Sequence, residues 1–215
     1  MTVPDRPKPR KAARDVRRRQ LMEATIDVLA TRGYSSLTIS DVSRAAGLSL
    51  GIVNFHFDSK AVLLADTLKY LAVQYRDNWT AAVNAAGDDP AARLYAMTSA
   101  DFDEEFCTLR TLQAWVSFWA EAQSRPAYDE VYGEEEAEYL KTLEDLCTAL
   151  SSHNDYNRPQ SGKLDARVIN ALTDGLWVAL AHTPPGISRP EALSALHNCL
   201  AAFYPAHFDA NGPVN

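Results

Sequence analysis

Several features of other protein classes are missing from this chain of 215 residues. No run reaches the roughly 18 consecutive apolar residues that a membrane-spanning helix needs, and the polar N-terminus lacks the apolar segment of a secretory signal. The only cysteines are Cys107, Cys147 and Cys199, which lie far apart. An odd number at this spacing builds neither a disulfide framework nor a CxxC metal site. We therefore expect a cytoplasmic protein with reduced thiols, no membrane contact, no metal and no other cofactor.

Strand patterns are missing as well. Nowhere do β-branched residues alternate with polar ones between hairpin turns, so no sheet is expected. Apolar residues recur instead at helical spacing, and the first such face consists of Leu21, Ala24, Thr25, Val28 and Leu29. Gly33, residues 87–90, Pro126 and residues 184–186 break the pattern. The sequence predicts an all-α fold of about nine helices without internal repeats.

Charge is distributed unevenly along the chain. The formal net charge is −7, yet residues 1–60 carry 11 Lys and Arg against 6 Asp and Glu. The remaining residues carry 10 basic and 22 acidic side chains. Such asymmetry is typical of a nucleic-acid-binding end joined to a body with another task. A disordered basic tail on an acidic protein gives the same counts, so charge alone leaves both interpretations open.

Residues 37–64 have the pattern of two short helices joined by a tight turn. Thr38 is a good N-cap for the first helix, and Asp41 suits its first turn. Gly47 stands where the turn needs a positive φ, and Ser49 can cap the second helix. This arrangement is typical of a helix-turn-helix, in which the second helix enters the major groove of DNA.

The second of these short helices has a predicted inward and outward face. Val53 and Phe57, four residues apart, are expected to lie in the core. The side chains expected to point outward are those of Leu50, Ile52, Asn54 and His56, with Phe55 at the edge.

Residues 17–64 resemble the DNA-binding domain of the TetR family of bacterial repressors. The resemblance rests on Thr38, Ala46-Gly47, Ser49-Leu50-Gly51, Phe55-His56-Phe57 and Lys60. In the C-terminal half, residues 102–106, 112–126 and 171–180 resemble the BetI subgroup, repressors of choline-to-glycine-betaine pathways. One departure from the family is Leu50, at a position that is often basic. It removes a phosphate contact and offers an apolar one, for instance to a thymine methyl group.

The resemblance implies a regulator that binds a palindromic operator as a homodimer. Asn54 is the best candidate for reading a base edge, because an amide can pair bidentately with adenine. Arg17, Arg18 and Arg19 stand at the expected helix start, where positive charge is unfavourable unless an anion such as DNA compensates it. A solvated tail end is the alternative for these arginines. The predicted DNA-binding residues are Arg17, Arg18, Thr38, Ser49, Leu50, Gly51, Ile52, Asn54, Phe55, His56 and Lys60, of which Thr38, His56 and Lys60 are expected to position phosphates.

The chain divides into four predicted segments. These are a disordered basic arm (1–16), the helix-turn-helix domain (17–62), an effector-binding and dimerisation domain (63–208) and a disordered tail (209–215). The last two helices, roughly 163–182 and 188–206, are expected to form the dimer contact, as the resemblance also implies. The predicted interface residues are Ala171, Gly175, Ala179, Leu193, Leu196 and Leu200. A buried helix within one chain is the alternative.

Aromatic residues of the C-terminal domain indicate an effector site. Trp115 and Trp119 lie four residues apart on one helix face, and other aromatic side chains are expected nearby. Together with the carboxylate of Asp174, they could hold a quaternary ammonium or another cation by cation–π contacts. Paired tryptophans at this spacing also fit an ordinary core. The predicted effector-binding residues are Tyr75, Trp79, Phe102, Trp115, Trp119, Tyr139, Asp174 and Trp177.

Two further hypotheses compete with a ligand-controlled regulator. Asp101, Asp103, Glu104 and Glu105 are similar to the acidic metal clusters of helical prenyl-transfer enzymes. A second cluster is missing, however, and the five histidines lack HExxH-like spacing. We therefore expect no enzyme. An architectural DNA-binding protein is the other hypothesis, and it would bind DNA without sequence preference.

Overall fold

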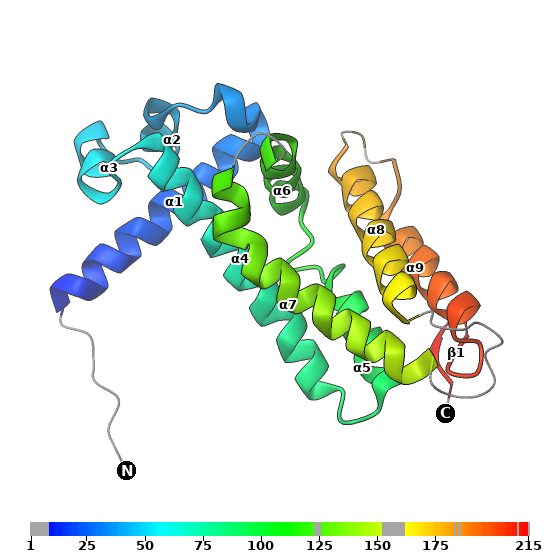
Figure 1. The fold of residues 1–215 in the computed structure, drawn as a ribbon. Coiled ribbons are helices and arrows are strands. Elements are labelled where there is room, and N and C mark those ends of the chain that lie inside the picture. The colour runs from blue at the N-terminus through cyan, green and yellow to red at the C-terminus, as the bar shows by residue number, and fades with distance from the viewer. Residues whose placement is uncertain are drawn as a thin grey trace, which may run out of the picture.

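A computed structural model describes residues 9–122, 126–151, 162–182, 184, 186–209 and 211–214, without the side chains of residues 9–12, 122 and 126–129. Within these residues the chain forms nine α-helices and two very short strands, which confirms the predicted all-α fold (Figure 1). The elements are α1 (Pro9–Ser36), α2 (Ile39–Ala45), α3 (Leu50–His56), α4 (Lys60–Ala85), α5 (Pro90–Ala100), α6 (Leu109–Ala122), α7 (Pro126–Ser151), α8 (Gly162–Ala181), α9 (Arg189–Phe203), β1 (Phe208–Asp209) and β2 (Gly212–Pro213).

The first helix is longer than the sequence pattern predicts. It begins at Pro9, so residues 9–16, which we expected in a disordered arm, are helical instead. Proline suits the first turn of a helix. Because residues 13–17 are all exposed, they show no helical spacing of apolar residues from which this part of the helix could be predicted. The predicted inward face from Leu21 to Leu29 is buried, and Gly33 interrupts the helix with a φ of 73°.

The turn between α2 and α3 follows from local hydrogen bonding and one glycine. The backbone N–H of Asp41 donates to the Thr38 hydroxyl oxygen at 3.1 Å, and that hydroxyl donates to the Asp41 carboxylate at 2.7 Å. The Thr38 hydrogen bond, with the nearby charges of Arg32 and Arg44, holds the pKa of Asp41 below its ordinary value. Gly47 closes the turn with a φ of 64°, where a residue with a Cβ is strained.

α4 connects the helix-turn-helix to the C-terminal body. Its first turn is capped by the Ser59 hydroxyl, which accepts a hydrogen bond from the backbone N–H of Val62. The helix then runs into the body, where α5 and α7 pack against it (Figure 1). Its apolar stripe is buried throughout, namely Leu64, Leu68, Leu71, Tyr75 and Trp79.

The other helices of the body place α6 at the junction between the two halves. α6 packs against α1 on one side and against α8 on another, while α7 and α9 also pack against α8. α6 is therefore a helix of the C-terminal body in direct contact with the first helix of the N-terminal half.

The chain end is ordered where we expected a disordered tail. β1 and β2 pair antiparallel as a small hairpin, and Phe208 is buried. Gly212 packs so closely on Tyr95 that an added Cβ would lie 3.1 Å from that ring. Within the described residues, 209 and 211–214 thus belong to the folded body.

Candidate DNA-binding surface and ligand pocket

The outward face of α3 lies at the edge of the molecule, far from α8 and α9 (Figure 1). Large apolar side chains face the solvent there, and Phe55 is 75% exposed. None of the described residues hydrogen-bonds the side chains of Asn54 and Ser49. The exposed residues of α3 and its cap are Ser49, Leu50, Gly51, Ile52, Asn54 and Phe55. A helix that offers free polar groups beside apolar ones is suited to base edges and thymine methyl groups.

The expectation that His56 points outward is wrong. His56 is buried on the same face as Val53, because a residue three positions along a helix returns to nearly the same side. Val53 and Phe57 are buried, as predicted. The Nδ1 atom of His56 has no hydrogen-bond partner among the described residues. Burial, followed by the charges of nearby arginines of α1, lowers the pKa of His56, so a neutral imidazole is favoured there and cannot attract a phosphate by charge.

Two predicted DNA-binding residues, Arg18 and Lys60, make contacts within the chain. Arg18 donates to the His56 carbonyl oxygen, forms an ion pair with Asp66, and places its guanidinium carbon 4.4 Å from the Phe57 ring centroid. Arg18 therefore ties α1 to the end of α3 and to α4. Lys60 donates to the Tyr34 carbonyl oxygen at 3.3 Å and is only partly buried.

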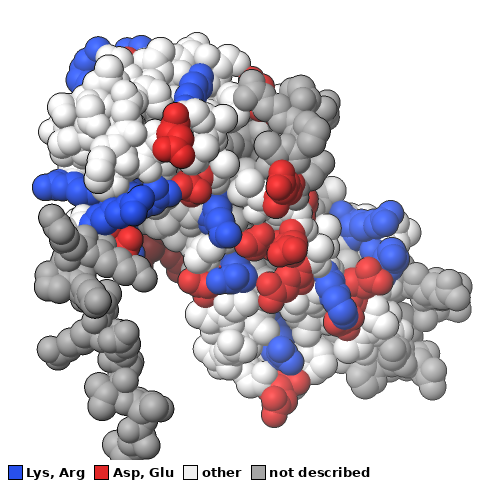
Figure 2. All heavy atoms as spheres, turned by 60° about the vertical axis from the view of Figure 1, so that its left-hand side comes forward, with Lys and Arg blue, Asp and Glu red and all other residues white. Residues whose placement is uncertain are grey.

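Other basic side chains of α1 remain exposed, namely Arg14, Arg17 and Arg19. Because α1 begins at Pro9, these residues lie one to three turns inside the helix, and the expected penalty at a helix start does not apply to Arg17 and Arg19. Figure 2 shows Lys and Arg side chains gathered below a largely uncharged upper lobe, and further Lys and Arg interspersed with Asp and Glu over the middle and right of that face. The charges of Arg14 and Arg17 act on His56 at the end of α3, so these two residues add positive charge beside the helix-turn-helix.

A small pocket lies between α4, α6, α7 and α8. Five predicted residues line it, namely Tyr75, Trp119, Tyr139, Asp174 and Trp177. Four further lining residues were not predicted, namely Tyr132, Glu136, Asn170 and Thr173. The cavity measures about 40 Å³, room for about two or three water molecules. The buried Thr173 hydroxyl has no hydrogen-bond partner among the described residues, so a polar group remains available in the wall.

Three predicted effector residues do not line the pocket. Phe102 is buried in the core, and Trp79 packs edge-on against the ring of Tyr139. The Trp115 ring lies behind the wall, with centroid distances of 6.2 Å to Trp119 and 6.4 Å to Trp177. Of the tryptophan pair on α6, only Trp119 reaches the cavity, and the core interpretation holds for Trp115.

The pocket walls are largely aromatic. Trp119 and Trp177 stack, with ring centroids 6.0 Å apart and planes inclined by 19°. The Tyr75 ring lies 5.6 Å from Trp177 and 5.4 Å from Tyr139, centroid to centroid. These four rings come from four different helices. The negative faces of such rings attract cations.

A carboxylate lies beneath these rings. Asp101 is fully buried, and its two carboxyl oxygens accept hydrogen bonds from the hydroxyls of Tyr75 at 2.9 Å and Tyr139 at 2.7 Å. The Asp101 carbonyl oxygen accepts a third bond from the Trp177 indole N–H at 3.0 Å. Burial raises the pKa of Asp101 to about 7 in spite of the two hydroxyl donors. Partial burial, with the nearby Glu136, also raises the pKa of Asp174 to about 6, although Asp174 keeps an exposed surface at the pocket.

The acidic segment of the enzyme hypothesis does not assemble into a cluster. Asp101 points inward, whereas Asp103, Glu104 and Glu105 are exposed, and Glu104 pairs with Arg189 at 2.6 Å. Across the part of the chain that the structure describes, no group of His, Cys, Asp and Glu is placed to hold a metal ion. No helix in that part is long and apolar enough to cross a membrane.

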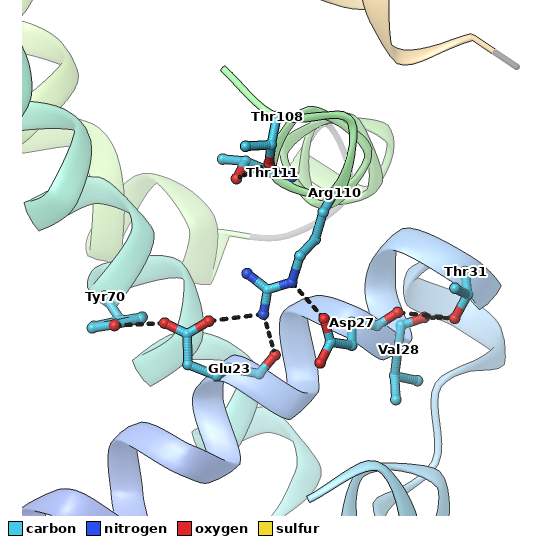
Figure 3. Close-up of polar contacts among 8 residues, drawn as sticks. All are labelled: Glu23, Asp27, Val28, Thr31, Tyr70, Thr108, Arg110 and Thr111. Carbon is cyan, nitrogen blue, oxygen red and sulfur yellow. Dashed lines mark hydrogen bonds and ion pairs between the residues drawn. The ribbon is translucent and has the colours of Figure 1, made fainter. Parts of the chain in front are cut away.

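The two halves of the molecule are joined by a polar junction (Figure 3). Arg110 of α6 donates to the Glu23 carboxylate and carbonyl oxygens and pairs with Asp27, so it bonds with α1 at three points. Tyr70 of α4 donates to the other Glu23 carboxyl oxygen at 2.7 Å. The junction therefore connects α6, α1 and α4, the helices that lead from the pocket to the DNA-binding half.

An exposed apolar stripe runs along α8. Its members follow a spacing of four and three residues and therefore share one helix face, namely Leu164, Val168, Ala171, Gly175 and Val178. Ala171 and Gly175 were predicted as dimer-interface residues, whereas the three large side chains of the stripe were not. Ala179 and Leu193 are half-buried. Leu196 and Leu200 are fully buried within the chain, so they belong to its own core and offer no surface to a second chain.

Comparisons with known proteins identify both halves. Residues 21–67 match the family described as bacterial regulatory proteins of the tetR family, and residues 90–205 match the family described as BetI-type transcriptional repressor, C-terminal. The HTH-type transcriptional regulator BetI of Burkholderia thailandensis is 30% identical over 82% of this chain and 88% of its own length. BetI of Escherichia coli (strain SMS-3-5 / SECEC) is 28% identical over 92% of this chain and 98% of its own length.

Solved structures share the fold. A transcriptional regulator from Pseudomonas aeruginosa PAO1 superposes with a TM-score of 0.76 at 24% identity, over 93% of both chains. A regulator from Saccharomonospora viridis, solved in complex with choline, gives a TM-score of 0.75 at 21% identity over 86% of this chain and 96% of its own. Together with the matched families, these findings show that the chain belongs to the TetR family and is a transcriptional regulator with a BetI-type C-terminal domain.

Proposed function

We propose that this regulator acts in the cytoplasm as a homodimeric repressor that leaves a palindromic operator when a cationic small molecule enters the aromatic pocket. The observation that carries the proposal is the presence, in one chain, of an exposed recognition helix and a small pocket lined by aromatic rings and carboxylates. The helix is suited to the major groove of DNA, and the pocket to a small cation.

Sequence-specific contact is assigned to α3. Its free Asn54 amide can read an adenine, and Leu50 and Ile52 can meet thymine methyl groups. Phe55, on the same exposed face, extends the apolar contact. Arg17, Thr38, Ser49 and Lys60 are assigned to phosphates, and the backbone at Gly51 admits close approach of the DNA. Arg18 and His56 support this surface from within, because both are engaged or buried in the fold.

Dimerisation is assigned to the α8 stripe. One recognition helix reads only a few base pairs, so a second copy is needed for an operator of useful affinity. Leu164, Val168 and Val178 would be covered by the second chain, and Ala171 and Gly175 would let two helices approach closely. Half-buried Ala179 and Leu193 would lie at the rim. Two such helices related by a twofold axis would place two copies of α3 on two half-sites.

The effector is assigned to the class of quaternary ammonium compounds. Tyr75, Trp119, Tyr132, Tyr139 and Trp177 present ring faces and edges to the cavity. Cation–π contacts contribute about 0.5–2 kcal/mol each, more when water is excluded. Asp174 and Glu136 add negative charge at the wall, while Asn170 and Thr173 add polar groups for a hydroxyl or carbonyl substituent. The structural neighbour with bound choline is consistent with this class.

Ligand entry would move α6. The cavity of about 40 Å³ is far smaller than the pockets of about 300 Å³ or more that hold larger ligands. The Trp119 ring is half-buried and stacks on Trp177, so a ligand must separate these rings. Displacement of Trp119 would shift α6 and, through Arg110, also α1. An effector that prefers the shifted state would reduce operator affinity, typically by about 1–3 kcal/mol.

Selection of random duplex DNA on the purified full chain tests this function. Enrichment of one palindrome at physiological salt, followed by its release on titration with choline, glycine betaine or tetramethylammonium, is the expected result. If one palindrome is enriched but none of these compounds releases it, the sequence-specific regulator is supported and the ammonium effector is contradicted. An architectural protein would enrich no sequence and would be displaced equally by bulk genomic DNA, whereas a specific complex should be about 10³-fold tighter or more.

A further inference from the structure

The buried carboxylate of Asp101 lies beneath the pocket without lining it. We infer that Asp101 is the positioning residue and counter-anion that makes the pocket selective for cationic over neutral ligands of the same shape. This inference rests on the proposed effector site, since it concerns the same cavity.

Asp101 fixes three pocket walls at one point. Its carboxyl oxygens accept the hydroxyls of Tyr75 from α4 and Tyr139 from α7, and its carbonyl oxygen accepts the indole N–H of Trp177 from α8. All three side chains line the cavity, whereas Asp101 itself does not. The Tyr75 ring centroid lies 5.4 Å from that of Tyr139 and 5.6 Å from that of Trp177, and all three side chains are bonded to the same residue. A residue in this place holds the rings ready for a ligand.

The charge of Asp101 has no positive counterpart among the residues that the structure describes. Among the described residues, no Lys, Arg or His forms an ion pair or hydrogen bond with it, and the neighbouring Asp174 is also acidic. A buried carboxylate without a cation is costly, and two hydroxyl donors offset that cost only in part. A cation on the other side of the Tyr75 and Tyr139 rings would supply the missing charge. Hydroxyl donation to a carboxylate also enriches the rings in electrons, which strengthens their attraction for a cation.

A purely structural role makes a different prediction. An aspartate that only anchors two tyrosines could be replaced by asparagine, because the amide keeps the size and one acceptor oxygen. Its NH₂ group can donate to the second tyrosine hydroxyl, which can rotate to accept. Asp101→Asn therefore removes the charge and leaves the anchoring bonds in place. Asp103→Asn, on the exposed loop two residues along, is the matched control.

The test compares choline with dimethylbutanol, its neutral carbon isostere, on the full chain. Binding is followed by quenching of tryptophan fluorescence, because Trp119 and Trp177 line the cavity. In Asp101→Asn, we expect choline affinity to fall about tenfold to a hundredfold and dimethylbutanol affinity to change less than about twofold. Asp103→Asn should match the wild type for both ligands. Equal losses of both ligands in Asp101→Asn would overturn the inference and leave only a structural role.

A second variant guards against a folding defect. Tyr139→Phe keeps the ring in the wall and removes its bond to Asp101, so it should also weaken choline more than dimethylbutanol. Unchanged choline binding in both folded variants would contradict the role of Asp101 while the pocket itself stands. Failure of the wild type to bind any ammonium compound would instead remove the proposed effector class, and this inference with it.

Discussion

Arg110, at the start of α6, holds Glu23 of α1 at two points, with its Nη2 atom 2.8 Å from a carboxyl oxygen and 2.7 Å from the carbonyl oxygen (Figure 3). Trp119 stands on the same helix and forms part of the pocket wall. One helix thus links a ring that the proposed effector would displace to hydrogen bonds with the DNA-binding half. This link makes the account of ligand control testable at residues that touch neither ligand nor DNA.

Arg110→Met should separate effector binding from operator release. Choline should quench tryptophan fluorescence with nearly wild-type affinity, but its effect on operator affinity should fall by about 1–2 kcal/mol, because α6 no longer pulls on α1. Both ion pairs are part-exposed, so thermal unfolding should show a stability loss of only about 0.5–1 kcal/mol. Lys141→Met, which removes an exposed pair with Asp145, is the control, and equal release in both variants would exclude the Arg110 link.

Asn54→Ala should weaken operator binding by about 1–3 kcal/mol and relax base preference at one position of each half-site. The reason is the loss of an amide that is free and exposed on α3. Anisotropy titrations across a set of operator variants measure both effects. Asn84→Ala, an exposed asparagine on α4, should leave the profile unchanged. A wild-type profile for Asn54→Ala would show that Asn54 reads no base.

Trp119→Ala should abolish release by choline while operator binding stays intact. The variant removes one of the two stacked rings of the cavity. It therefore removes a cation–π contact to the effector and also the ring whose displacement is proposed to shift α6. Trp79→Phe, which changes a buried ring outside the lining, serves as the control and should respond to choline like the wild type. Retained release in Trp119→Ala would place the effector elsewhere.

Val168→Asp should convert the proposed dimer to a monomer, because it would bury a charge within the α8 stripe of the proposed interface. Sedimentation should show the change in mass, and operator affinity should drop at least about a hundredfold as one half-site is lost. Val214→Asp changes an equally exposed valine on the C-terminal segment and should stay dimeric. A dimeric Val168→Asp variant would assign the interface to another face.

Choline affinity should depend on pH. A quaternary ammonium keeps its charge at every pH and binds better to the charged form of Asp101. Because burial raises the pKa of Asp101 to about 7, choline affinity should rise between about pH 6 and 8 and then level off. Tyr75 and Tyr139, which face Asp101, stay protonated in this range, since burial raises the pKa of each well above 10. Asp174, with a pKa of about 6, should leave a smaller rise at lower pH in Asp101→Asn. Identical profiles for wild type and Asp101→Asn would contradict the assignment.

The same pKa fixes the sign of a stability effect. In the unfolded chain Asp101 titrates near 3.8, so between about pH 4 and 7 the folded state binds more protons than the unfolded one. The contribution of Asp101 to stability is therefore largest below about pH 4 and is lost as pH rises through about 7. Relative to Asp101→Asn, the wild type should lose on the order of 1.4 kcal/mol per pH unit in this window. Urea unfolding at several pH values measures it.

Sequence patterns predicted the parts of the fold that local chemistry decides. The Thr38 cap, the positive φ at Gly47 and the inward placement of Val53 follow from neighbours within a few residues. The helical spacing of apolar residues likewise predicted the buried face of α1 from Leu21 to Leu29. The helical conformation of residues 9–16 was not predicted, because an exposed helix shows no helical spacing of apolar residues.

The remaining features depend on contacts between distant segments. His56 was predicted to point outward, although its spacing of three residues from Val53 places it inward. Leu196 and Leu200 were assigned to a dimer, because an apolar stripe does not reveal whether its own chain covers it. Asp101 was noticed only for its acidic neighbours. Its partners Tyr75, Tyr139 and Trp177 come from three helices, and no local pattern brings them together.

The most direct test of the account is the anisotropy of a labelled operator duplex, bound by the full wild-type chain and titrated with choline at physiological salt. The account predicts that the complex dissociates as choline saturates the tryptophan quench, with both curves sharing one midpoint. Dissociation by dimethylbutanol at equal concentration, or a complex that persists when the quench is complete, would contradict control of this regulator by a cation in the aromatic pocket.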